Sequence, residues 1–200
     1  MSNLGPRLYL ASTSPRRREL LQQIGVSFEV ISPDIPEHVL AAESPADYVC
    51  RLAAEKARAG LSLLPDTAEE KVLILGSDTS VVVDGNILGK PLDREHGMAM
   101  LARLSGRSHQ VMTAVSLLDN QGLQQTRLRI SEVTFRTLDS VEIESYWRTG
   151  EPLDKAGAYA VQGLGAVFIE QLSGSYSAVM GLPLFETSEL LESFGLSVLQ

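Results

Sequence analysis

The segment KVLILGSDTSVVVDGNILGKP, residues 71–91, places one acidic side chain between two apolar runs. The runs Val72–Leu75 and Val81–Val83 have the aliphatic and β-branched content of buried strands. Gly76 and Asp78 stand between them. A strand fixes the position of a carboxylate at its end, while the adjacent segment can stay open to a substrate. Asp78 is therefore a candidate general base or metal ligand; the alternative is that it only caps a turn.

The composition is that of an ordinary globular protein, with 200 residues, 44% hydrophobic and 21% charged. This length suits a single domain spanning residues 1–200, with a lobe division expected near Ser105. A formal net charge of −8 argues against a nucleic-acid partner, because nucleic-acid binding needs a basic surface. A phosphate ligand would then require local cations or a metal ion.

The single cysteine, Cys50, excludes an internal disulfide and suits a reducing compartment. The sequence contains no signal-peptide pattern and no apolar run of membrane-spanning length. We therefore expect a soluble, cytoplasmic protein with no membrane partner.

A strand at Arg7–Ala11 is followed by a helix that begins at Ser14-Pro15, a common start signal. Free backbone N–H groups, the positive end of the helix dipole, two hydroxyls and the basic run 16–18 converge at this helix start. Such a combination is typical of a phosphate site. The alternative is a solvated basic helix start.

A second helix is predicted from Ser44-Pro45 to about Gly60. Lys56 falls on the same face as its apolar residues Val49 and Leu52, so this lysine either extends out to solvent or has a use. Glu37 lies in the irregular segment before the helix. Later elements are a helix after Asp93, a hairpin of 108–118 and 123–136, a helix after Asp139, a strand at 167–172 and a closing helix after Pro183.

The segment 154–165, DKAGAYAVQGLG, fits no structural template well. Its small residues would let the backbone approach a ligand closely, with Asp154, Lys155 and Gln162 as polar groups within reach. A flexible glycine loop without a binding role is the alternative.

Several chemistries are excluded, because the sequence lacks a Walker-type GxxxxGK[ST], a GxGxxG after a strand, an HExxH motif and a GxSxG motif. What remains is a set of acids and a set of cations. This combination is the one required for metal-assisted attack of water on a phosphate chain. The acids are Asp78, Glu37 and Asp154, and the cations are Arg16, Arg17, Lys56, Lys90 and Lys155.

Seven motifs in order resemble the Maf family of nucleoside triphosphate pyrophosphatases: LYLASTSPRRRELL, RLAAEKARAG, LGSDTSVVV, LGKPLD, LSGRSHQVMTAV, EPLDKAGAYAVQG and GSYSAVMGLP. The resemblance implies an α/β fold: a two-lobed, twisted mixed β-sheet flanked by helices, similar to inosine triphosphatases, with the active site in the cleft. It also implies hydrolysis of a nucleoside triphosphate to the monophosphate and pyrophosphate with a divalent cation, Mg²⁺ or Mn²⁺. A homodimer is left open.

Family roles carry over to matching positions of this chain. Asp78 is expected as the proton acceptor, with Glu37, Lys56 and Lys90 as further catalytic residues and Asp78 and Glu37 as metal ligands. The specificity positions Arg16, Thr79 and Gln162 resemble the dTTP and UTP branch rather than the 7-methyl-GTP branch. The remaining substrate-binding candidates are Ser12, Ser14, Arg17, Asp154 and Lys155.

Two departures from the family pattern are visible. Ser77 replaces the commoner alanine before the acid, and Pro36 stands where many relatives have an acid, which bears on the number of metal ligands. Two rival functions stay open: a non-catalytic nucleotide-binding regulator of septum formation and cell division, and a phosphatase that releases inorganic phosphate.

Overall fold

The computed structural model describes residues 5–65 and 71–199. Contacts group the chain into two compact units, each built from separate stretches of sequence. The first unit comprises residues 1–78, 113–129 and 181–200, and the second comprises residues 79–112 and 130–180. Ser105 lies inside the second unit, and the single domain with a lobe division near this residue stays a prediction.

The described strands form one seven-stranded sheet with the order β2-β1-β3-β5-β6-β7, and β4 pairs with β3 outside this order. β1 is parallel to β2 and β3, whereas the β3–β4 and β6–β7 pairs are antiparallel. The sheet is therefore mixed, as expected for the α/β class. The strand bounds are β1 Arg7–Ala11, β2 Glu29–Ile31, β3 Val72–Val83, β4 Asn86–Leu88, β5 Ser108–Asp119, β6 Gln124–Phe135 and β7 Ile169–Ser173.

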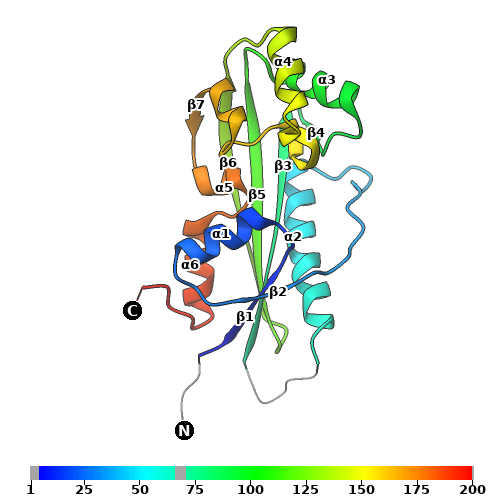
Figure 1. Cartoon of the computed structure of the whole chain (residues 1–200). Helices are drawn as coiled ribbons and strands as arrows, with labels where there is room; N and C mark the ends of the chain where they lie inside the picture. Colours follow the sequence, from blue (N-terminus) through cyan, green and yellow to red (C-terminus); the bar gives the residue numbers. More distant parts are fainter. Residues whose placement is uncertain (1–4, 66–70, 200) are drawn as a thin grey trace. The chain divides into compact units, whose positions relative to one another are not determined.

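The helices of the first unit are α1 Pro15–Gln23, α2 Pro45–Ser62 and α6 Leu184–Ser193. Figure 1 shows α2 running beside the first-unit part of β3. The Ser44 side chain caps α2 by accepting from the Asp47 N–H, as the Ser-Pro start predicts. Val49 and Leu52 are fully buried, so the predicted apolar face of this helix is confirmed.

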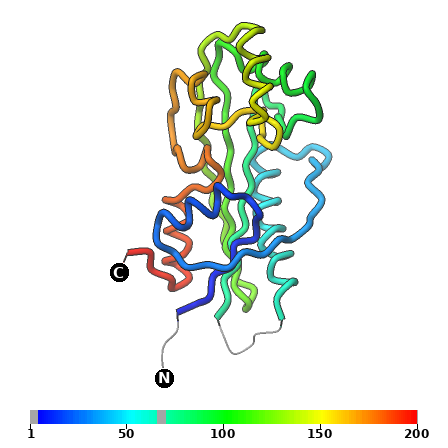
Figure 2. Tube along the Cα trace, viewed as in Figure 1, coloured from blue at the N-terminus to red at the C-terminus, as the bar shows by residue number. Residues whose placement is uncertain are grey.

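The second unit contains α3 Arg94–Leu104, α4 Ser140–Arg148 and the short α5 Tyr176–Met180. Asp139 and Glu142 form a capping box at the start of α4. Figure 2 shows the segment after α4 as a series of short turns, coloured yellow to orange, and it contains three 3₁₀ helices. They are η1 Glu151–Asp154, η2 Ala156–Ala158 and η3 Leu164–Phe168.

The structure corrects the expected environment of Asp78. The two apolar runs and the residues between them form one continuous strand, so Asp78 lies in the interior of β3 and not at the end of a strand. The strand continues because Val72–Leu75 pairs with β1 and Val81–Val83 pairs with β4. The short helix α5 was not expected from the sequence. None of the described helices has both the length and the apolar character needed to span a membrane.

Candidate active site

The candidate site begins with the close approach of α2 to β3 at Gly76. A Cβ atom added to Gly76 would lie 2.2 Å from the Ala53 carbonyl oxygen and 2.8 Å from the Ala57 amide nitrogen. The glycine therefore lets the helix backbone rest directly on the strand. Successive side chains of a strand alternate between faces, so Asp78 points to the same face as Gly76 and toward α2. This geometry brings Lys56, on α2, to Asp78.

Lys56 joins two carboxylates that come from different segments. Its Nζ lies 2.7 Å from Asp78 Oδ1 and 2.6 Å from Glu37 Oε1. The Lys56 and Asp78 side chains are 12% and 10% exposed, whereas the Glu37 side chain is 47% exposed. The sequence left open whether Lys56 extends out to solvent, and the structure places its ammonium between the two acids.

Asp78 is buried, with 7% of its surface exposed. Burial raises the pKa of its carboxyl, because a charged group loses solvation, while Lys56 and Arg17 act in the opposite direction and Glu37 adds to the increase. A carboxylate with a raised pKa and two cationic neighbours is typical of a functional site.

Arg17 is the arginine of the basic run that faces the acids. Its Nε donates to the Gly181 carbonyl at 2.8 Å and its guanidinium donates to Ser12 Oγ at 3.2 Å. Burial lowers the pKa of Arg17, and the charges of Asp78 and Glu37 oppose this change. Hydrogen bonds to Gly181 and Ser12 thus fix the guanidinium, and both carboxylates are close enough to affect its pKa.

Two hydroxyls support this arrangement. The Ser12 hydroxyl, which is buried, accepts from the Ser14 N–H at 3.2 Å as well as from Arg17. The Ser77 hydroxyl lies 2.8 Å from the Ala114 carbonyl oxygen and 3.0 Å from the Gly181 carbonyl oxygen. The same Gly181 oxygen accepts the hydrogen bond from Arg17. Ser77, which the sequence marked only as a departure from the family, therefore contacts the carbonyl that orients Arg17.

Arg16 and Ser14 are placed differently. Arg16 forms an exposed ion pair with Glu19 at 2.9 Å, within α1. Ser14 occupies the N-cap position of α1, but its side chain makes no capping hydrogen bond. Of the two arginines singled out from the sequence, Arg17 is the one whose guanidinium senses the charges of Asp78 and Glu37.

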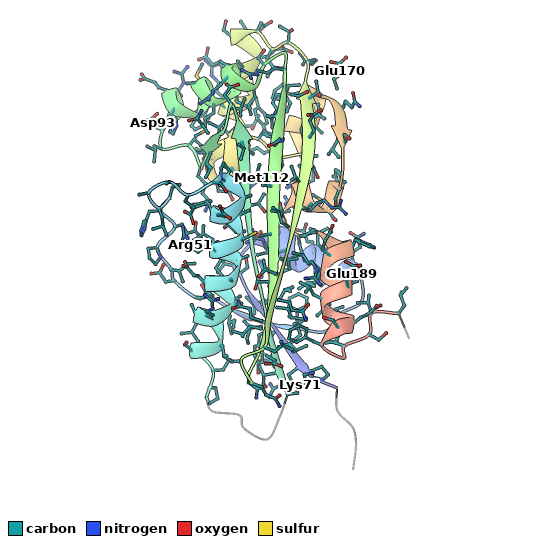
Figure 3. All side chains as sticks on the ribbon, turned by 180° about the vertical axis from the view of Figure 1, so that it is seen from behind. Arg51, Lys71, Asp93, Met112, Glu170 and Glu189 are labelled. Atoms are coloured by element: carbon teal, nitrogen blue, oxygen red, sulfur yellow. The ribbon has the colours of Figure 1, made fainter. Side chains whose placement is uncertain are left out.

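Two residues that the sequence did not single out hold the segment carrying Glu37. Arg51, labelled on α2 in Figure 3, donates to both carboxylate oxygens of Glu43, at 2.6 and 2.8 Å, and to the His38 carbonyl at 3.0 Å. The hydrogen bond from Arg51 is the main reason that the pKa of Glu43 is lowered to about 2. The Tyr48 hydroxyl donates to the Glu37 carbonyl at 3.2 Å.

A sequence signal for Tyr48 exists. It precedes Leu52 and Lys56 by four and eight positions, so all three share one helix face. Burial raises the pKa of Tyr48, and the charges of Asp78 and Glu37 contribute to the same effect. The tyrosine is thus part of the cluster around Lys56.

The other candidate residues lie in the second unit. The Gly157 N–H donates to the Gly89 carbonyl at 3.0 Å, which brings the segment of Lys90 to that of Asp154 and Lys155. Lys155 forms an ion pair with Asp154, and this contact together with the charge of Lys90 lowers the pKa of Asp154. Thr79 and Gln162, also in this unit, are half-buried.

A divalent cation fits the donor set of the first unit. Across residues 5–65 and 71–199 no group of three or more histidine, cysteine or acidic side chains gathers to form a metal cage. Asp78 and Glu37 nevertheless converge on one cationic atom, Lys56 Nζ, with one oxygen each. Mg²⁺ commonly takes one or two protein carboxylates and completes its coordination with water and substrate phosphates.

Comparisons with known proteins agree with the motif resemblance. The dTTP/UTP pyrophosphatase of Alkalilimnicola ehrlichii is 55% identical over 190 residues, covering 94% of this chain and 93% of that protein. The dTTP/UTP pyrophosphatase of Saccharophagus degradans is 55% identical over 193 residues, covering 96% of this chain and 91% of that protein.

A solved structure of a nucleoside-triphosphatase, a dITP/XTP pyrophosphatase from Mycobacterium abscessus, is 21% identical, with a TM-score of 0.40 over 66% of this chain and 75% of that chain. This likeness is too weak to bear on the site. The model of the Maf-like protein family, in contrast, matches residues 7–194. With nearly the whole sequence matched, the chain belongs to the Maf family.

Proposed function

We propose that this protein hydrolyses pyrimidine nucleoside triphosphates, dTTP and UTP and modified pyrimidine nucleotides of the same shape, to the monophosphate and pyrophosphate. The substrate class follows from relatives that are 55% identical over more than nine-tenths of the chain and are named dTTP/UTP pyrophosphatase. The observation that carries the chemistry is the buried Asp78 held by Lys56 next to Arg17.

Asp78 acts as the general base. Its carboxylate accepts a proton from water as the water oxygen bonds to the α-phosphorus, and the bond from that phosphorus to the bridging oxygen breaks, so that pyrophosphate leaves with the electron pair. Burial supports this role, because a raised pKa makes the carboxylate a stronger base than an exposed aspartate. The contact with Lys56 fixes the orientation of the carboxylate.

The cations offset the charge of the triphosphate. Arg17 offers a guanidinium to phosphate oxygens, and the start of α1 adds backbone N–H groups, the hydroxyls of Ser12 and Ser14, and Arg16. Lys56 and Lys90 stabilise the negative charge that grows on the leaving pyrophosphate. Asp154 and Lys155 are assigned to substrate binding in the second unit.

Base choice is assigned to Gln162, with Thr79 and Arg16 as further specificity positions. The carboxamide of Gln162 offers one N–H donor, suited to O4, and one oxygen acceptor, suited to N3–H of thymine or uracil. Adenine presents an N6–H donor and an N1 acceptor at these places and would leave both groups of the carboxamide unpaired. Guanine repeats the pattern with O6 and N1–H, so its exclusion is assigned to the larger size of the purine base.

A divalent cation, Mg²⁺ or Mn²⁺, is assigned to Asp78 and Glu37 together with substrate oxygens. When bound, it supplies Lewis-acid polarisation of the phosphate and neutralises charge beside the carboxylates. Glu37 is the more accessible of the two ligands, since nearly half of its side chain is exposed.

Product identification is the decisive experiment. The purified protein is incubated with each common nucleoside triphosphate and Mg²⁺ or Mn²⁺, and the products are separated by chromatography. We expect monophosphate and pyrophosphate, with dTTP and UTP ahead of GTP by about tenfold or more in kcat/KM. Release of inorganic phosphate would instead indicate a phosphatase, equal rates on GTP and dTTP would contradict the base assignment, and no turnover at all would favour the non-catalytic regulator.

Two further expectations accompany this function. The reducing cytoplasm is the proposed compartment, because the chain has one cysteine and it is unpaired. The homodimer stays a prediction that light scattering of the purified protein would test.

A further inference from the structure

Gln162 lies in a turn whose conformation is fixed by other residues of the second unit. The Gly163 N–H donates to the Ala160 carbonyl at 3.3 Å, so Gln162 is the third residue of a four-residue turn. η3 follows at once, beginning at Leu164.

Glu151 and Tyr146 hold both ends of the turn through one hydrogen-bonded group. The Glu151 carboxylate accepts from the Leu164 N–H at 2.8 Å and from the Gly165 N–H at 3.0 Å. The Tyr146 hydroxyl donates to the same carboxylate at 2.7 Å and accepts from the Ala160 N–H at 3.2 Å. Backbone groups before and after Gln162 are therefore tied to a single carboxylate–phenol pair, which we call the Glu151–Tyr146 clamp.

The fit around the clamp is close enough to select glycine at two positions. A Cβ atom on Gly163 would lie 2.3 Å from Glu151 Oε2, and one on Gly165 would lie 2.7 Å from the Tyr146 hydroxyl oxygen. Both separations are shorter than van der Waals contact. The two glycines of the sequence VQGLG thus make room for the clamp. From the sequence, we expected the small residues of this segment to allow close approach of the protein backbone to a ligand.

Packing around Tyr146 and ionisation of Glu151 stabilise the clamp. The Tyr146 side chain is 5% exposed and packs edge-on against Phe168, with ring centroids 4.9 Å apart. Burial raises the pKa of Glu151, but the hydrogen bonds from Tyr146, Gly165 and Leu164 outweigh this effect and lower it. Glu151 is consequently ionised at neutral pH and accepts from all three donors.

We propose that Glu151 and Tyr146 are positioning residues for base selection, which hold the backbone on both sides of Gln162 so that its carboxamide meets the substrate in one orientation. The inference rests on the proposed function, in which Gln162 reads the pyrimidine edge. Neither clamp residue contacts the nucleotide; both act through the turn that carries Gln162.

Two substitutions test the clamp with little change of shape. Glu151→Gln leaves one acceptor oxygen for three donors, the Tyr146 hydroxyl and the Leu164 and Gly165 N–H groups. The side-chain NH₂ that replaces the other oxygen cannot accept a hydrogen bond. Tyr146→Phe removes a single hydroxyl and leaves the Ala160 N–H without its acceptor. Matched controls in the same unit are Glu142→Gln, which alters a carboxylate bonded to Arg136, and Tyr159→Phe, which alters a buried phenol bonded to His109.

The readout is the ratio of kcat/KM for dTTP to that for ATP, because N6–H and N1 of adenine reverse the donor and acceptor pattern of O4 and N3–H. We expect this ratio to fall by about tenfold in each clamp variant, because an unfixed carboxamide no longer penalises the wrong base. The ratio should stay within about twofold of the wild-type value in both controls. A merely structural role would lower activity on both substrates together and leave the ratio unchanged, which would overturn the proposal.

Hydrogen exchange provides a second test that needs no variant. The Leu164 side chain is exposed, yet its amide should exchange slowly in the wild-type protein because it is bonded to Glu151. Exchange of the Leu164 and Gly165 amides at the rate of unbonded surface amides would contradict the clamp.

The kinetic results distinguish failure of the proposed function from failure of this inference. A wild-type protein with no preference for pyrimidines would overturn both. Clamp variants that keep the pyrimidine preference of the wild-type protein would overturn the inference alone.

Discussion

At the scale of single residues, Asp78 is the group on which the proposed chemistry depends. Its carboxylate is buried and bonded to Lys56, and the charges of Lys56 and Arg17 oppose the increase in its pKa that burial causes. The Asp78–Lys56 contact also explains why the lysine occurs on an apolar helix face. Loss of the carboxylate should therefore affect catalysis more than folding.

Asp78→Asn should keep the fold and lower kcat by about 10²–10⁴-fold, since the amide is nearly the same shape, can still accept from Lys56, and cannot take a proton from water. Steady-state kinetics on dTTP, with circular dichroism for folding, measures this. The control is Asp84→Asn, which removes an exposed carboxylate paired with Arg107. Near-wild-type turnover in folded Asp78→Asn would move the base elsewhere, with Glu37 as the next candidate.

His109 should make stability depend on pH. The imidazole is 3% exposed, and burial, assisted by the charge of Arg107, lowers its pKa from 6.5 to about 4. The unfolded chain binds a proton below pH 6.5 and the folded chain resists it down to about pH 4, so stability is lost as the pH falls through this range. The shift corresponds to about 3 kcal/mol in the free energy of unfolding.

Urea unfolding between pH 7 and pH 4 tests this expectation. The wild-type protein should lose stability more steeply on acidification than His109→Leu, whatever the absolute stability of the variant. His38→Gln, which removes an exposed imidazole, should follow the wild-type slope. Equal slopes for wild type and His109→Leu would show that another group titrates.

At the scale of elements, the contact of α2 with β3 sets the geometry of the site. Lys56 reaches Asp78 only because the helix backbone rests on the strand at Gly76. The helix also carries Tyr48 and Arg51, which hold the segment of Glu37. A small displacement of α2 would therefore disturb several site residues at once.

Gly76→Ala should destabilise the protein by about 1–3 kcal/mol or more, because the new methyl group would overlap the Ala53 carbonyl and push α2 away from β3. Activity should fall together with stability, since Lys56 moves with the helix. Gly89→Ala is the matched control, because nothing lies within 4 Å of its added Cβ. Thermal unfolding of both variants measures the difference, and equal melting temperatures would mean that the helix can shift at no cost.

At the scale of the whole molecule, charge decides how a triphosphate can be bound. The chain carries a formal net charge of −8, and the two central carboxylates stand beside the proposed phosphate site. Lys56, Arg17 and the other site cations offset only part of the repulsion. A bound divalent cation would supply the remainder.

Activity should therefore vanish in excess EDTA and return when Mg²⁺ or Mn²⁺ is restored. The measurement is pyrophosphate release from dTTP by metal-stripped protein across a titration of each cation. Ca²⁺, which prefers more ligands at longer distances, is a useful comparison. Full turnover by the stripped protein in EDTA would refute the metal-assisted mechanism.

The sequence alone determined the elements whose signals are local. The caps of α2, α3 and α4 and the apolar face that carries Lys56 follow from residues a few positions apart, and the structure confirms them. Asp78 and the cations could be singled out because their residue types suit phosphate chemistry. The family could be recognised because its motifs occur in order along the chain.

Only the tertiary structure decided which of those residues meet. Lys56 and Asp78 are 22 residues apart, and Arg17 and Gly181 are 164 apart, so no local pattern could select Arg17 over Arg16. The same holds for the continuous β3, whose path through Asp78 is stabilised by pairing with other strands. The Glu151–Tyr146 clamp likewise forms only when the segment 146–165 has folded, because its hydrogen bonds join groups 5 to 14 positions apart that no regular helix or strand spacing pairs.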